Sequence, residues 1–326
     1  PMSIRMMELL EEKLSKHDAW KNFVDLYYLI KSATIYAYGI KKKTLLFNIE
    51  TLLVVLNELN KKEEHPLYPF IGSWNVRFNE VIRDNYNIIT EFIEKINSEL
   101  KDWIGLKNID KAKYFENLKT IQEEFNFPLR IFTLNYDLCI ETILRNTIKI
   151  ERGFNSDDKS WNHKRFTQTT IDSETAVYLY KIHGSIDWET DEVTKTVCYR
   201  DSTASKPDLI FGSQYKLQYV DPYLFLFSEL RHYSLNAKLI VCIGYSFSDE
   251  HVNGLLSQAL KHNPLCKLYY LPNCIEEDLI KKVLNVTDTG KLIKSDWNTA
   301  KEFFENIKLE HFANLFDDDD YINSPF

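Results

Sequence analysis

The chain has 326 residues, of which 44% are hydrophobic and 27% are charged, so it can form a substantial core and is neither disordered nor collagen-like. Its formal net charge of -8 argues against direct, sequence-independent nucleic-acid binding, which needs concentrated Lys and Arg. The sequence has neither a long apolar run that predicts a membrane span nor a signal-peptide pattern, so we expect a cytoplasmic protein.

Apolar residues recur mostly at helical spacing from about Met2 to Phe125. The stretches with this pattern are 6–14, 23–38, 44–59 and 81–100. Pro66 and Pro69 interrupt the pattern and Pro128 ends it, because proline lacks an amide donor and disfavours helix in the residue before it. We therefore predict a helical region over residues 1–127 that is packed on the following domain or inserted into it.

After Pro128 the pattern changes to short apolar strands that alternate with helices. The expected strands are 129–134, 177–182, 208–212, 238–244, 267–271 and 291–294. Helices are expected near 137–147, 222–235, 249–262, 274–284 and 297–308. Apolar strands separated by helices predict a doubly wound, mostly parallel, Rossmann-like α/β sheet over residues 128–326. The segment 151–166 is polar and irregular, and a C-terminal helix and the acidic tail 317–320 end this domain.

The five cysteines form neither a CxxC pair nor a Cys/His zinc spacing, so we expect no zinc site. Cys139 and Cys242 lie in apolar runs and are expected to be buried, reduced core residues.

Polar or small residues follow three of the predicted strands, in 131-IFTLNYD-137, 180-YKIHGS-185 and 239-LIVCIGYSFSDEH-251. Ligands of open α/β sheets bind outside the carboxyl ends of the strands, so these strand ends predict a site. Each signal has a structural alternative. Asp137 and Asp249 could only cap helices, and His183 could be a structural histidine.

Together the three segments resemble the sirtuin-like NAD-consuming fold. The TLNYD segment is similar to the Gln-Asn-Ile-Asp element of that family, KIHGS to its Leu-His-Gly-Ser element, and 244-GYS-246 to the Gly-Thr-Ser turn that holds a ribose. GYSFSDEHVN and the preceding helical region look most like the bacterial sirtuin-like NAD hydrolases of antiphage defence. The resemblance covers about Pro128 to Lys294.

The resemblance implies that NAD is bound and consumed at these strand ends. Cleavage of the nicotinamide–ribose bond builds positive charge on the sugar, and a histidine, with an ordinary pKa near cellular pH, suits proton acceptance. We expect His183 to bond a ribose hydroxyl and act as general base. Asn135 would position the water or the ribose, and Asp137 would orient Asn135 or the carboxamide.

Further residues are expected to contact the dinucleotide. Gly184 would let it approach the backbone, where a Cβ would collide. The complete set of expected NAD-binding residues is Thr133, Gly184, Ser185, Gly244, Tyr245, Ser246 and Phe247.

The sequence departs from the family in two ways. The family's glycine-rich diphosphate loop is missing, since the 9 glycines are not clustered, and we expect the corresponding strand and loop to precede Pro1. The deacylase branch carries a zinc module on CxxC pairs, which this sequence lacks. Without that module a peptide groove is doubtful, and water is the expected acceptor.

These expectations favour an NAD glycohydrolase, acting as an antiphage-defence effector that depletes NAD. The resemblance also implies restraint by homo-oligomerisation, or by a partner such as a HerA-type ATPase, an Argonaute-type protein or a filament. The helical region could form an oligomer interface or simply cover the sheet. Alternatives are an NAD-dependent deacylase or ADP-ribosyltransferase, and a non-catalytic sensor of NAD or ADP-ribose.

Overall fold

The computed structural model describes most of the chain. The described residues are 2–40, 47–61, 76–83, 85–105, 108–167, 175–191, 193–201, 203–204, 207–209, 220–272, 276–313 and 315. The predictions for Pro66, Pro69, Cys274, residues 210–212 of the expected third strand, and the tail 317–320 lie outside these residues.

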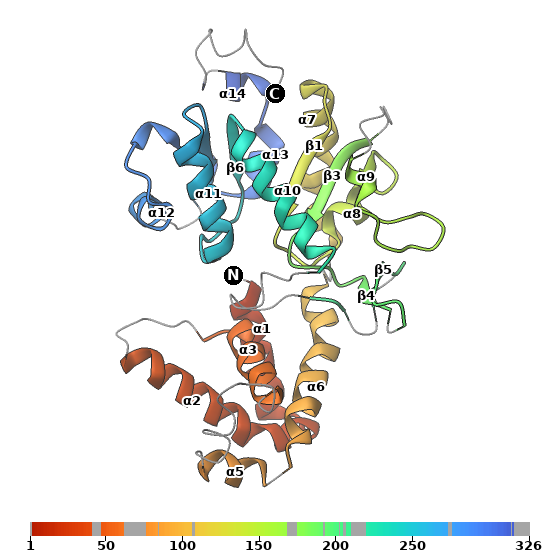
Figure 1. The fold of residues 1–326 in the computed structure, drawn as a ribbon, viewed down its shortest axis with the longest axis vertical. Helices are drawn as coiled ribbons and strands as arrows, with labels where there is room; N and C mark the ends of the chain where they lie inside the picture. The colour runs from red at the N-terminus through yellow and green to blue at the C-terminus, as the bar shows by residue number, and fades with distance from the viewer. Residues whose placement is uncertain are drawn as a thin grey trace.

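Helices from the first third of the chain gather at one end of the molecule (Figure 1). They are α1 (Met2–Lys16), the 3-10 helix η1 (Asp18–Phe23), α2 (Val24–Ile40), α3 (Ile49–Asn60), α5 (Val76–Ile82) and α6 (Asn87–Ile104). Apolar side chains such as Leu10, Leu52 and Phe92 bury completely between them and form what we call the helical core.

The single helix predicted over 81–100 is wrong at its start. Helix α5 ends at Ile82 and α6 begins at Asn87. Arg83 between them has a φ of 50°, in the left-handed region that a right-handed helix cannot continue through.

The last helical elements before the sheet belong to a different core. The 3-10 helix η3 (Ile109–Glu116) and α7 (Asn117–Phe125) place Leu118 and Ile121 against β-strand residues such as Val177 and Leu179. Asn126, with a φ of 57°, ends α7 in the left-handed conformation before the first strand. Residues 109–125 therefore cover the sheet, and the domain division at 127/128 stays a prediction.

The α/β part contains two parallel three-stranded sheets. One has the order β1 (Leu129–Thr133), β3 (Thr175–Lys181), β2 (Lys149–Glu151), and the other β6 (Leu239–Cys242), β7 (Lys267–Tyr270), β8 (Leu292–Lys294). A short antiparallel pair, β4 (Trp188–Thr190) and β5 (Val197–Tyr199), follows β3. The prediction of a mixed α/β, mostly parallel Rossmann-like fold is confirmed.

The two parallel sheets bury their faces in the same two cores. On one face Ile131 of β1 and Val241 of β6 join the core around Leu179, which we call the first sheet core. On the other face Phe132 of β1 and Ile240 of β6 join the core around Tyr180, the second sheet core. Among the described strands, β1 is paired only with β3 and β6 only with β7. The halves thus form one layered body with an interruption between β1 and β6.

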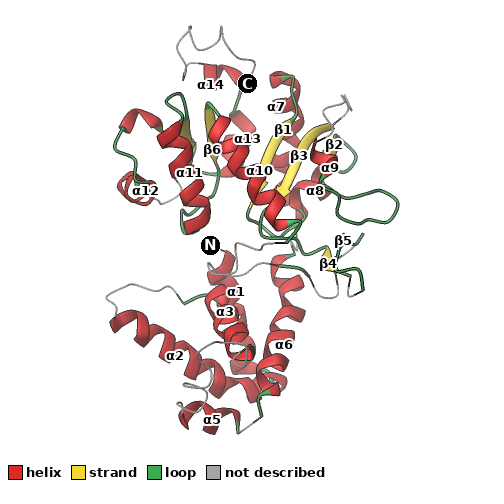
Figure 2. Ribbon diagram, in the orientation of Figure 1, coloured by secondary structure: helices red, strands yellow, loops and turns green. Residues whose placement is uncertain are grey.

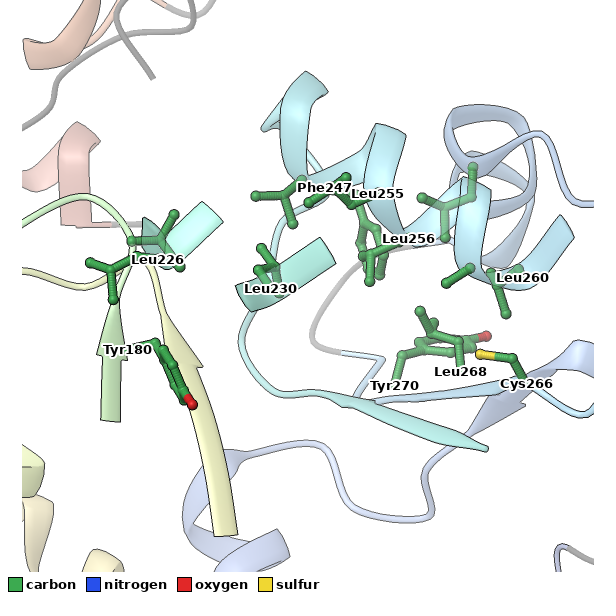
Figure 3. Packing of buried hydrophobic residues seen from close by; sticks show 14 of the residues in the cluster. Tyr180, Leu226, Leu230, Phe247, Leu255, Leu256, Leu260, Cys266, Leu268 and Tyr270 are labelled. Atoms are coloured by element: carbon green, nitrogen blue, oxygen red, sulfur yellow. The ribbon is translucent and has the colours of Figure 1, made fainter. Parts of the chain in front are cut away.

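Helices cover both faces of these sheets (Figure 2). They are α8 (Cys139–Leu144), α9 (Lys164–Thr167), α10 (Tyr223–Asn236), α11 (Glu250–His262), α12 (Glu277–Leu284), α13 (Ala300–Asn306) and α14 (Leu309–Ala313), with the 3-10 turn η4 (Thr289–Lys291) between α12 and β8. Figure 3 shows Leu256 and Leu260 of α11 directed toward Leu268 and Tyr270 of β7. Five of the predicted strands and all five helices predicted after Pro128 are present.

The segment 151–166 is irregular for most of its length, as predicted, yet its aromatic residues are part of the second sheet core. Phe154 and Phe166 are buried, and the Phe166 ring stacks on Tyr180 with centroids 4.4 Å apart. The polar composition of this segment therefore gave no indication that its aromatic residues are part of the core.

The described cysteines Cys139, Cys198, Cys242 and Cys266 are free thiols. Burial raises the pKa of Cys242 from 9.0 to about 12 and that of Cys266 to about 11. Such thiols are inert at neutral pH, because the reactive form is the thiolate.

Candidate active site

Parallel pairing of β1 and β3 carries Asn135 and His183 to one edge of the sheet. Thr133 is in register with Lys181, and the amide of Ile182 donates to the Thr133 carbonyl at 3.0 Å. Asn135 and His183 each lie two positions beyond this matched pair. Both residues therefore leave the sheet at the carboxyl ends of adjacent strands.

The loops that follow the two strands are bonded to each other. The amide of Ile186 donates to the Tyr136 carbonyl at 3.0 Å, and the hydroxyl of Ser185 lies 3.5 Å from the same oxygen. The buried Lys181 ammonium donates to the carbonyl of Asp137 and pairs with Glu141 of α8 at 3.0 Å. These bonds fix the loop after β1 relative to the loop after β3.

A second, partly buried ion pair holds the far end of the β3 loop. Arg152 donates from Nη2 to both oxygens of Asp187, at 3.0 and 2.8 Å, and its Nε lies 3.5 Å from Glu141. Burial opposes the charge on Arg152, but the carboxylates of Glu141 and Asp187 raise the pKa of the guanidinium above its ordinary value. The contact of Nη2 with both carboxylate oxygens anchors Asp187 and, through it, residues 183–187.

The third predicted segment reaches the same place through Asp249. Nε2 of His183 lies 3.1 Å from Oδ2 of Asp249, and both residues are buried, at 4% and 2% exposed. The other oxygen, Oδ1, accepts from the amides of His251 and Val252 and caps α11. The helix-cap alternative for Asp249 is thus observed, together with a histidine contact that sequence reasoning missed. Its only sequence signal was that Asp249 belongs to the third strand-end segment.

Tyr136, the aromatic residue of the TLNYD segment, lies beside the histidine and was not among the predicted site residues. Its side chain is 7% exposed and its ring centroid is 6.4 Å from that of His183. Burial, followed by the charges of Glu50 and Asp249, raises the pKa of the phenol well above 10.0, so the ring stays neutral. Tyr136 and Ile186 also belong to the helical core. The helical region therefore packs directly against the candidate site.

The two glycines at the strand ends have different surroundings. Gly184 has a φ of +86°, and a Cβ there would come 2.2 Å from the carbonyl oxygen of Asp208. The backbone carbonyl of Asp208 thus fills the space beside Gly184. The sequence had predicted that a dinucleotide would occupy that space. Its role toward a ligand stays a prediction. Gly244 has a φ of +66° and open space around it.

Internal hydrogen bonds hold the turn from Gly244 to Asp249. The Tyr245 hydroxyl donates to the Asp249 carbonyl at 3.1 Å and lies 2.7 Å from Oδ1 of Asn253, whose Nδ2 donates to the Phe247 carbonyl at 2.8 Å. Gly244 and Ser246 are exposed at the turn. The Phe247 side chain is buried in the second sheet core and that of Ser185 is fully buried. Binding by these two residues would therefore have to use their backbones.

The remaining predicted residues, Asn135, Thr133 and Asp137, lie in the loop after β1 or at its start. Asn135 is exposed, and its amide donates to the hydroxyl of Thr133 at 3.1 Å. Asp137 accepts from the amide of Cys139 at 2.9 Å at the start of α8, so its structural alternative is observed. The expectation that Asp137 orients Asn135 stays a prediction.

A pocket of about 390 Å³ lies beside this site and not within it. Residues of α8, β2, β5 and the loop after β3 line it, including Glu141, Arg152 and Asp187. Neither Asn135 nor His183 is among the lining residues. The pocket therefore borders the ion pairs that hold the β3 loop.

In the part of the chain that the structure describes, no group of three or more His, Cys, Asp and Glu residues could hold a metal ion. No helix within the described ranges is long and apolar enough to cross a membrane.

Comparison with known families agrees with the geometry. Residues 129–278 match the family model described as a SIR2-like domain. A search of curated proteins found no match to the chain. The matched segment contains all three strand ends and the His183–Asp249 contact. The part of the chain that builds the candidate site is therefore similar to SIR2-like domains, a family of NAD-binding domains.

Proposed function

We propose that the protein is an NAD glycohydrolase, which cleaves NAD with water to nicotinamide, ADP-ribose and a proton. The observation that carries this proposal is the placement of Asn135 and His183 beyond a matched pair on adjacent parallel strands, within the SIR2-like segment. An amide and a buried imidazole at one sheet edge are suited to positioning a nucleophile and accepting its proton.

In the proposed reaction the bond between C1′ of the ribose and the nicotinamide nitrogen breaks, and its electron pair leaves with nicotinamide. Positive charge develops on the sugar, and a water held by the exposed Asn135 amide adds to C1′. His183 takes up the released proton, directly or through a ribose hydroxyl. The neutral Tyr136 ring and the helical core exclude bulk water behind the imidazole.

We further propose that the enzyme is an antiphage-defence effector, restrained until activated. The resemblance of GYSFSDEHVN and of the preceding helical region to defence NAD hydrolases supports this proposal. An unrestrained NAD hydrolase would deplete its own host. Assembly of copies, or a partner such as a HerA-type ATPase, would supply the restraint or the activation.

The test is to incubate the protein with NAD and follow nicotinamide and ADP-ribose by chromatography. Release without any peptide is expected, and His183→Ala and Asn135→Ala should each lower its rate by roughly 100-fold or more. Asn162→Ala, a change of the same kind in the loop after β2, is the matched control and should retain activity.

The same assay distinguishes the other functions. Release of nicotinamide only with an acylated peptide would replace hydrolysis by deacylation, and transfer of ADP-ribose to protein would indicate a transferase. Binding of NAD without any release would indicate a sensor.

A further inference from the structure

The two carboxylate oxygens of Asp249 face different groups. Oδ1 accepts from the amides of His251 and Val252, at 3.0 and 3.3 Å, at the first turn of α11. Oδ2 lies 3.1 Å from Nε2 of His183, a buried charge contact that does not have hydrogen-bond geometry in this structure. Helix capping alone needs one oxygen, so it does not account for the placement of the second oxygen against a buried imidazole.

We propose that Asp249 is a positioning residue that keeps Nε2 of His183 protonated and leaves Nδ1 as the proton acceptor. A carboxylate beside one ring nitrogen favours the tautomer with the proton on that nitrogen, and the opposite nitrogen is then the base. The role of this tautomer in catalysis rests on the proposed NAD hydrolysis. The assignment of the tautomer itself rests only on the contact between His183 and Asp249.

The surroundings of the ring support this assignment. Tyr136 faces the ring and stays neutral because its pKa is raised well above 10.0 by burial and then by the Glu50 and Asp249 charges. Among the described residues, Asp249 places a carboxylate at contact distance from the imidazole.

Hydrogen bonds around Asp249 fix the position of its carboxylate. The backbone carbonyl of Asp249 accepts from the Tyr245 hydroxyl at 3.1 Å, and Asn253 of α11 donates to the Phe247 carbonyl at 2.8 Å. The amides of the first turn of α11 fix Oδ1. With the loop and the helix start both fixed, Oδ2 has little freedom to leave His183.

Asp249→Asn tests the proposal, because asparagine is as good a helix cap as aspartate but carries an amide in place of the second oxygen. The amide cannot accept a proton from Nε2 if its oxygen caps α11. The ¹⁵N chemical shifts of His183 in the full chain are expected to change from the Nε2-protonated to the Nδ1-protonated form. The kcat for nicotinamide release should fall by roughly 100-fold or more with KM changed less than about threefold, and the urea midpoint should stay unchanged.

Asp288→Asn is the matched control. Asp288 caps η4 by accepting from the amide of Gly290 at 2.9 Å. This variant should alter neither the His183 shifts nor kcat. If Asp249→Asn does not fold, Asp249→Ser keeps a capping hydroxyl and removes the carboxylate, with the same expected results.

Unchanged His183 shifts in Asp249→Asn would overturn the proposal and leave Asp249 as a helix cap alone. An altered tautomer with unchanged kcat would likewise remove its part in catalysis. A wild-type protein that releases no nicotinamide would contradict the proposed function, and the NMR measurement would still decide the tautomer.

Discussion

At the scale of single residues, small side chains at the strand ends serve the chain's own packing as well as any ligand. Gly184 adopts a φ of +86° and forms an isolated bridge with Leu209. The sequence pattern indicated that a small residue was needed there. It could not indicate that the neighbouring group was the Asp208 carbonyl, because that contact depends on the path of a later loop.

We expect Gly184→Ala to lower the free energy of unfolding by roughly 3 kcal/mol or more, because the added Cβ would meet the Asp208 oxygen at 2.2 Å in a left-handed backbone. Gly244→Ala is the matched control, with a positive φ but open space, and should cost about 1 to 2 kcal/mol. Urea unfolding measures both. Equal losses for the two variants would show that the Asp208 contact does not matter.

Some contacts at the candidate site can be predicted from local sequence patterns, and others depend on how distant segments pack. Asn135 and His183 could be brought together from sequence, since each follows an apolar strand and parallel strands end at one edge. The contact of His183 with Asp249 could not, because it depends on how the turn after β6 crosses toward β3 between two sheets whose described strands are not paired with each other.

At the scale of elements, the length of a strand limited how readily the apolar pattern could predict it. Runs such as β1, β3, β6 and β7 carry enough consecutive apolar residues to be recognised. Of the described three-residue strands, β8 was predicted and β2, β4 and β5 were missed, since three residues contain too little alternation or apolar length to distinguish a strand from a loop reliably.

The buried Lys181 joins β3 to α8 in a way that no pattern predicts. It is 1% exposed and lies 3.0 Å from Glu141, while its ammonium also donates to the Asp137 carbonyl. A lysine at the end of an apolar strand is ordinarily expected to reach solvent. Here it ties the strand end to the helix that follows the Asn135 loop.

Lys181→Met should therefore lower the free energy of unfolding by roughly 3 kcal/mol, because it removes the nearer of two cations beside the Glu141 carboxylate and the donor to the Asp137 carbonyl. The double variant Lys181→Met/Glu141→Gln should recover part of that loss by removing the buried charge. Chemical denaturation compares the two variants. If the double variant is less stable than the single one, the Arg152–Glu141 contact and not the lysine pair dominates the cluster.

At the scale of the whole molecule, three cores hold the chain together, and buried titratable rings make that packing sensitive to alkali. Tyr136 lies in the helical core and Tyr223 in the second sheet core. Burial, with the nearby charges of Glu50 and Asp249 at Tyr136 and of Asp208 at Tyr223, raises the pKa of both phenols well above 10.0. Burial also raises the pKa of Cys266 to about 11.

These raised pKa values predict stability that is complete below the unfolded-state pKa and is lost as the pH rises. The unfolded chain releases its Cys266 proton near pH 9 and its tyrosine protons near pH 10, whereas the folded chain retains them. Above pH 10 each buried tyrosine should therefore cost about 1.4 kcal/mol per pH unit. Urea midpoints at pH 8, 10 and 11 measure the effect.

Tyr223→Phe is the control for this pH dependence. It removes one titrating group, so the loss of stability between pH 10 and 11 should be smaller than in wild type. A wild-type midpoint that is constant from pH 8 to 11 would contradict the burial of these phenols.

The order of most helices and strands, the mixed α/β class and the candidate site at the carboxyl ends of the strands could be predicted from the sequence itself, because apolar periodicity and strand-end residues are local properties. The tertiary structure alone decided that β1 and β6 share two cores without pairing, that Asp208 fills the space beside Gly184, and that Asp249 meets His183. Each of these contacts joins segments that are separated in the chain, and a local sequence pattern cannot predict which distant group will pack against a residue.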